Sequence, residues 1–174
     1  MGNEAVQVLD SRHFRSAMRN VPGAVSIVAT GVRPNRHGLT LTAGCSLSTE
    51  PSTVLVCVNK AAGAHDTIQS SGSFCWNILS AGQAALAQKF SGQDGSKGDI
   101  RFTEGDWQEL ATGAPSLIDA ICNFDCRLAH SHDAGSHTIF IGEVVAQHTN
   151  ADYEPLIYVR GQFVVPSRDD SSQH

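Results

Sequence analysis

Alternating and apolar stretches along the chain predict a largely β protein. The predicted strands cover residues 24–31, 38–48, 53–58, 73–79, 120–129, 137–148 and 156–165. Residues 53–58 are almost continuously apolar, which is typical of a strand buried on both faces. Polar turns with glycine or proline separate most neighbouring strands, so they are expected to pair as hairpins. The pattern therefore predicts a closed or nearly closed antiparallel barrel with short helices over its ends.

Helical periodicity is confined to a few short segments. Apolar residues spaced three and four apart predict an amphipathic helix over residues 10–21. The sequence Ser80-x-x-Gln83 is a capping box, and it opens a predicted helix that carries Phe90 on its apolar side. Residues 91–106 have no period, so we expect a mobile loop there that could close over a site.

One side of the predicted strand 38–48 is small and hydroxylated. It carries Thr40, Thr42, Gly44 and Ser46, whereas the other side is mainly apolar. Small polar side chains suit a flat polar ligand, and a glycine lets such a ligand approach the backbone. The alternative is a solvated strand face on which threonine reflects β-propensity. The alternation alone leaves both interpretations open.

Composition places the chain among ordinary globular proteins. It has 174 residues, 41% of them hydrophobic and 17% charged, which favours one domain with a packed core over 1–174. Residues 1–9 and 167–174 are predicted to be flexible tails. No apolar run is long enough for a transmembrane helix and no signal peptide is visible, so we expect a cytoplasmic protein without a membrane partner.

Net charge and cysteine content argue against several further classes of protein. The net charge is -5 and the basic residues are scattered, which argues against nucleic acid as a partner. Five cysteines, an odd number, indicate reduced thiols in the cytosol. The spacing of Cys122 and Cys126 and the run His130, His132 and His137 do not make a recognisable metal site. No Rossmann fingerprint or P-loop is present, so any nucleotide would be held by another geometry.

Several separate motifs occur together in one order. They are GLTLTAGCSLSTEP at 38–51, VCVN at 56–59, FCWNIL at 74–79, AQKFSG at 87–92, RF at 101–102, GAP at 113–115, GSH at 135–137, FIGEV at 140–144 and LIY at 156–158. Over residues 14–163 the chain thereby resembles the short-chain flavin reductases that serve two-component aromatic monooxygenases. The resemblance implies a mainly β fold, a Greek-key split β-barrel of the FMN-binding type with a few short helices. It also implies a homodimer whose subunits share a flavin groove.

The resemblance further implies a set of flavin-binding residues. They are Thr42, Ala43, Gly44, Cys45 and Ser46 at the isoalloxazine ring and ribityl chain, Cys57, Val58 and Asn59 along the flavin, Asn59, Lys60 and His65 near its phosphate, Phe90 at the ring or adenine, and Tyr158. Lys60 and His65, near a predicted helix start, offer positive charge and donors for a phosphate. Without the resemblance, Lys60 reads as a solvated loop lysine and Phe90 as a core residue.

His137 is the catalytic residue that the resemblance implies. Its imidazole would lie where the nicotinamide stacks on the flavin, hold the carboxamide and stabilise charge while hydride moves to flavin N5. Two positions depart from the family pattern. Ser136 stands where an aspartate or threonine is usual, and Gly44 stands where a larger residue is common.

The expected function is NAD(P)H:flavin oxidoreductase. Hydride would pass from NADH, or NADPH, to FMN or FAD, and the reduced flavin would go to a separate monooxygenase. Two alternatives stay open: a flavoprotein with fixed flavin that reduces ferric iron, a corrinoid or a quinone, and a non-catalytic barrel that binds flavin or haem.

Overall fold

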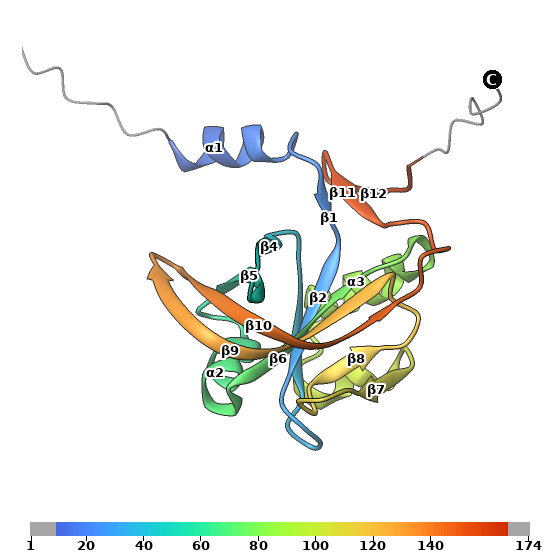
Figure 1. The fold of residues 1–174 in the computed structure, drawn as a ribbon. Helices are drawn as coiled ribbons and strands as arrows, with labels where there is room; N and C mark the ends of the chain where they lie inside the picture. Colours follow the sequence, from blue (N-terminus) through green and yellow to red (C-terminus); the bar gives the residue numbers. More distant parts are fainter. Residues whose placement is uncertain (1–9, 167–174) are drawn as a thin grey trace, which may run out of the picture.

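The structure, a computed structural model, describes residues 10–166 (Figure 1). The two predicted tails, 1–9 and 167–174, lie outside the described residues. Within 10–166 no helix has the length and apolar character needed to cross a bilayer. The longest of these helices has nine residues.

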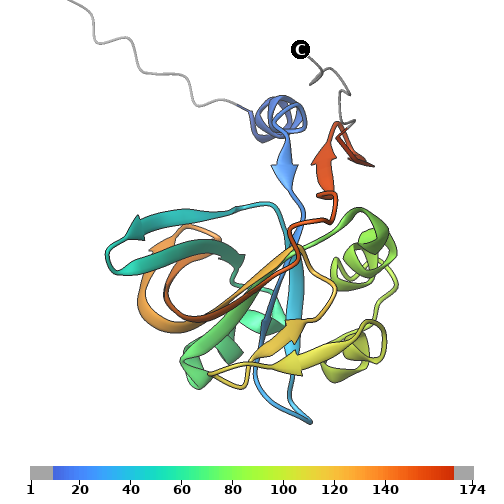
Figure 2. The ribbon, with the colours of Figure 1, turned by 45° about the vertical axis from the view of Figure 1, so that its right-hand side comes forward.

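A seven-stranded antiparallel sheet forms the body of the molecule, in the order β3-β2-β6-β9-β10-β5-β4. Its strands are β2 (Ser26–Thr30), β3 (His37–Leu41), β4 (Gly44–Thr49), β5 (Ser52–Asn59), β6 (Ser73–Ile78), β9 (Cys122–Ala134) and β10 (His137–Thr149). The sheet curls strongly on itself (Figure 2). β3 and β4 follow each other along the chain yet form opposite edges of the sheet, so the barrel is split between them. The predicted mainly β split barrel is confirmed.

Two small sheets flank the barrel. One joins β1 (Gly23–Ala24), β11 (Ile157–Val159) and β12 (Gln162–Val164), and the other joins β7 (Trp107–Glu109) and β8 (Pro115–Leu117). The single last strand predicted at 156–165 is wrong, because the chain turns back at Arg160 and Gly161, both with positive φ (54° and 83°). β11 and β12 form a hairpin at this turn.

The described residues also form short helices and 3-10 turns. They are α1 (Ser11–Met18), α2 (Gly63–Ser71), α3 (Ala84–Phe90) and the 3-10 turns η1 (Ala81–Gln83) and η2 (Gly98–Thr103). The Asp10 carboxylate caps α1 by accepting from the Arg12 amide at 3.0 Å. The predicted capping box is present, since the Ser80 amide donates to Gln83 Oε1 at 2.9 Å.

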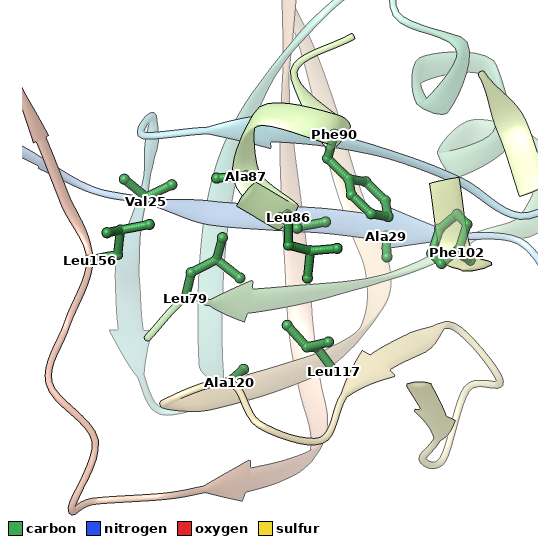
Figure 3. Close-up of a cluster of buried hydrophobic side chains, with 11 residues drawn as sticks. Val25, Ala29, Leu79, Leu86, Ala87, Phe90, Phe102, Leu117, Ala120 and Leu156 are labelled. Atoms are coloured by element: carbon green, nitrogen blue, oxygen red, sulfur yellow. The ribbon is translucent and has the colours of Figure 1, made fainter. Parts of the chain in front are cut away.

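Two buried clusters hold the layers together. Inside the curl of the sheet, β5 turns Val54, Val56 and Val58 toward Phe74 and Phe140. On the other side, α3 and the β7–β8 ribbon cover a second cluster around Val25, Leu79, Phe90, Phe102 and Leu117 (Figure 3). Because each strand alternates its side chains, the central strands supply both clusters.

The segment predicted as one strand at 38–48 is two strands. β3 ends at Leu41, β4 begins at Gly44, and the chain between them crosses from one edge of the sheet to the other. The Ala43 carbonyl still accepts from the Cys57 amide at 2.9 Å, so this crossing runs along β5. Alternation predicted the strand character correctly but carried no signal for the break.

The predicted irregular loop 91–106 contains η2 and is tied to the barrel. The Arg101 guanidinium donates to the carbonyls of Gly38 and Phe90 at 2.9 and 3.0 Å. Arg36, which is buried, pairs with Asp99 at 2.6 Å. These bonds fix the segment against β3 and the end of α3.

Candidate functional site

The outer face of the β4–β5–β10 surface gathers several of the predicted residues. In the β5–β10 pairing, Asn59 lies opposite His137 and Cys57 lies opposite Ile139. Their neighbours Val58 and Thr138 point the other way and are buried. Alternation therefore places Cys57, Asn59 and His137 on one partly exposed face. Cys45 on β4 is exposed and belongs to the same face.

The thiols of this face are close neighbours. Partial burial, followed by the proximity of Cys45, raises the pKa of the Cys57 thiol above its ordinary value. The neutral thiol is thus the form present near neutral pH. A small uncharged side chain at this position leaves an apolar surface beside Ile139, suited to a flat ring rather than to a nucleophile.

His137 stands at the start of β10, next to the turn at Gly135 and Ser136. Its Nδ1 is 2.9 Å from the Ser136 hydroxyl oxygen, and the ring is half-buried. The Lys60 amide donates to the Ser136 carbonyl at 3.0 Å, which ties the turn to the end of β5. When the Ser136 hydroxyl donates to Nδ1, Nε2 carries the ring proton and can donate outward.

Lys60 and His65 belong to a connected chain of polar contacts. His65 is buried, with Nδ1 2.8 Å from Asp66 and Nε2 2.9 Å from the Thr138 hydroxyl. That hydroxyl donates to Asp133 at 3.0 Å, and Asp133 pairs with Lys60 at 3.2 Å. The bonds from Lys60 and then from Thr138 lower the pKa of Asp133. Lys60 and His65, both predicted near the flavin phosphate, are therefore engaged within the chain.

Thr42, Ala43 and Tyr158 meet at a different place, where they line a cavity. This cavity, about 710 Å³, lies between α1, β1 and the crossing from β3 to β4. We call it the arginine cavity, because Arg12, Arg15 and Arg19 line it together with Thr42, Ala43 and Tyr158. A smaller cavity of about 230 Å³ shares Thr42 and Tyr158. Of the predicted hydroxylated face, Thr42 lines both cavities and Thr40 lines the smaller one.

The rest of that face does not form one ligand surface. The Thr40 hydroxyl donates to the Ala87 carbonyl at 2.7 Å beneath α3. A Cβ at Gly44 would lie 2.8 Å from the Trp76 ring, so the glycine makes room for an indole and not for a ligand. Ser46 opens onto a separate hollow of about 500 Å³. Of the two interpretations that the alternation left open, the structure gives no support to a single hydroxyl-lined surface along 38–48.

Two further predicted residues are buried, one in each hydrophobic cluster. Phe90 is 1% exposed and packs between Phe102 and Trp107, with ring centroids 5.0 and 5.5 Å away. Val58 is fully buried. In this chain Phe90 is a core residue with no ring face open to a flavin, and Val58 can contribute only its backbone.

Sequence reasoning missed the arginines of α1. Arg12, Arg15 and Arg19 are spaced three and four apart, which puts them on one side of a helix. This spacing was a readable signal. The apolar positions of the same segment give the stronger helical pattern, and the net negative charge of the whole chain masks this local basic cluster.

Comparison with known proteins defines the class. The model of the flavin reductase like domain family matches residues 18–166, which is most of the chain. The chain belongs to this family. It is 40% identical over 155 residues to an Agrobacterium fabrum protein named FMN reductase (NADH) RutF, covering 89% of this chain and 88% of that protein.

Solved structures agree with this assignment. BorF, the flavin reductase component of a bacterial two-component tryptophan halogenase, superposes with a TM-score of 0.83 at 31% identity, covering 91% of this chain and 100% of BorF. The Streptomyces globisporus NADH:FAD oxidoreductase SgcE6, in complex with NAD and FAD fragments, superposes with a TM-score of 0.85 at 28% identity, covering 96% of this chain and 99% of SgcE6. The predicted family is confirmed.

Proposed function

We propose that this chain is an NADH-dependent flavin reductase that passes hydride to exchangeable FMN or FAD. The observation that carries the proposal is the family match over residues 18–166. The relative named FMN reductase (NADH) favours NADH over NADPH as the donor. BorF is one component of a two-component system, and by analogy the reduced flavin made here goes to a separate monooxygenase.

The partly exposed face of β4, β5 and β10 fits a flat ring. Cys57 and Ile139 offer a small apolar floor, and the Asn59 side-chain amide, whose Oδ1 accepts from the Ala61 amide at 2.9 Å, offers a polar edge. The Thr42 side chain and Tyr158 continue this surface into the arginine cavity.

The chemistry of hydride transfer is supplied by the nicotinamide and flavin rings themselves. The chain's part is to stack and align them, and to hold charge at the nicotinamide. We assign this last role to His137, whose Nε2 carries a proton that it can donate when Nδ1 accepts from Ser136. Asn59, opposite His137, is positioned to orient the ring edge.

A turnover assay tests the proposed activity. Purified protein is mixed with NADH, and absorbance at 340 nm is followed with and without added FMN or FAD. We expect NADH oxidation that depends on added flavin and saturates with it. Turnover without added flavin would instead indicate a fixed prosthetic group, and no turnover with either flavin would leave a binding protein.

We also propose that the chain forms a homodimer through the same outer face. Leu55, Ile139 and Ile141 are aliphatic and only partly covered in the monomer. They lie in register on β5 and β10, so they form a continuous apolar strip. Burying this strip against a second copy would remove it from water and would enclose the ring-binding face between subunits.

A charge in the strip tests the dimer. Ile139→Asp should convert the dimer to a monomer, because an unpaired carboxylate would be buried at its centre. Light scattering after size-exclusion chromatography gives the mass. Gln69→Asp, an exposed change on α2, is the matched control and should stay dimeric. A monomeric wild-type protein would contradict this proposal.

Five free thiols fit a reducing compartment, and we place the reductase in the cytoplasm. We further infer that it works as one domain, because the two buried clusters share the central strands.

A further inference from the structure

α1 turns its basic side toward the arginine cavity. Arg12, Arg15, Ser16 and Arg19 all line the cavity, as expected for residues that repeat at helical spacing. None of the residues of α1 is buried. The helix stands above one end of the barrel beside the β11–β12 hairpin (Figures 1 and 2). The cavity is therefore bounded by a basic helix on one side and by the barrel edge on the other.

The charge of this cavity is unusual for the protein. The chain as a whole is acidic, with a net charge of -5, yet three arginines and no carboxylate line the cavity. Arg12 is partly neutralised by Asp10 at 3.2 Å. Within residues 10–166, Arg15 and Arg19 have no carboxylate partner: Arg15 Nε donates to the Ser11 carbonyl at 3.2 Å, and Arg19 lies beside Gly161. Unpaired guanidinium groups are strong ligands for phosphate oxygens.

The cavity adjoins the surface proposed for the flavin ring. Thr42 and Ala43 form its wall on the barrel side, and Ala43 is bonded to Cys57 of that surface. Its volume, about 710 Å³, is that of a nucleotide-sized ligand site. Lys60 and His65 are already bound to Asp133, Asp66 and Thr138. The free positive charge near the ring surface is thus on α1.

We propose that the arginine cavity binds the phosphate groups of the nucleotide, with Arg15 and Arg19 as the principal ligands. This assignment rests on the proposed reductase function, and it concerns binding rather than hydride transfer. Phosphates of a flavin nucleotide and of the nicotinamide dinucleotide share the same chemistry. Either would gain charge-assisted hydrogen bonds from α1, and the experiment separates the two sources.

The test compares ligands with and without phosphate. FMN and riboflavin are titrated into wild type and the Arg15→Gln/Arg19→Gln double variant, with flavin fluorescence as the readout. If the flavin phosphate occupies the cavity, the Kd of FMN rises by at least about tenfold, whereas riboflavin binding is unchanged. If the dinucleotide phosphates occupy it, the KM of NADH rises by a similar factor, that of reduced nicotinamide riboside is unchanged, and FMN affinity is retained.

Arg33→Gln, which removes an exposed arginine on the β2–β3 turn, is the matched control and should behave as wild type. Three results for the double variant would overturn the proposal. They are an equal loss of affinity for FMN and riboflavin, a change in oligomeric mass with no change in affinity, and unchanged affinity for every ligand. The fluorescence titration needs no turnover. A protein that binds FMN through Arg15 and Arg19 but does not oxidise NADH would contradict the reductase function and leave the phosphate site standing. An active protein in which the double variant does not distinguish ligands with phosphate from ligands without it would contradict only the phosphate site.

Discussion

Replacing Gly142 with alanine should lower the free energy of unfolding by about 3 kcal/mol. Gly142 lies in the middle of β10, and a Cβ there would be 2.6 Å from Cys126 Cβ and 2.6 Å from Phe74 Cζ. Both neighbours are fully buried, so neither can move without disturbing the cluster inside the barrel. Urea unfolding followed by tryptophan fluorescence gives the midpoint and the slope.

Gly82→Ala is the matched control for this change. No atom lies within 4 Å of a Cβ built at Gly82, and the residue is exposed. Its stability should stay within about 0.5 kcal/mol of wild type. Equal stabilities for the two variants would mean that the barrel interior is less tightly packed around Phe74 than the structure has it.

Replacing His137 with alanine should reduce kcat for NADH oxidation by about 100-fold, because the group that we propose holds charge at the nicotinamide is lost. FMN affinity should hardly change, since the ring rests on Cys57 and Ile139 in the proposed arrangement. Stopped-flow reduction of FMN measures hydride transfer, and fluorescence titration measures binding.

Two further variants distinguish loss of the proposed catalytic imidazole from a structural effect of the substitution on β10. His148→Ala removes a half-buried histidine near the far end of the same strand and should keep the wild-type rate. Ser136→Ala leaves the imidazole in place but removes the hydroxyl beside Nδ1, so its rate should fall less than that of His137→Ala. An unchanged rate in His137→Ala would remove this residue from the mechanism.

Local alternation was sufficient to predict the class of fold. The hairpin expected from 120–129 and 137–148 exists, with longer strands than predicted, because alternation and a glycine turn are local signals. The break between Leu41 and Gly44 was not predictable in the same way. It arises where the curled sheet reaches its opposite edge, which depends on all seven strands and not on the residues at the break.

The candidate site was predictable where it depends on register. Residues two apart on a strand share a face, so Cys57 and Asn59 fall together as the motif suggested. Whether a candidate site residue is buried could not be predicted from its residue type alone. Phe90 and His65 have the residue types of a ligand site, but one packs in an aromatic cluster and the other has both ring nitrogens engaged inside the chain.

The anchoring of residues 91–106 bears on how fast ligands exchange. Lifting this segment would break the bonds of Arg101 to two carbonyls, separate Arg36 from Asp99 and expose Phe102. An opening of this kind would cost all of these contacts together. For a reductase of the proposed kind, we therefore expect the release of reduced flavin to be timed by its affinity and by diffusion rather than by a movement of residues 91–106.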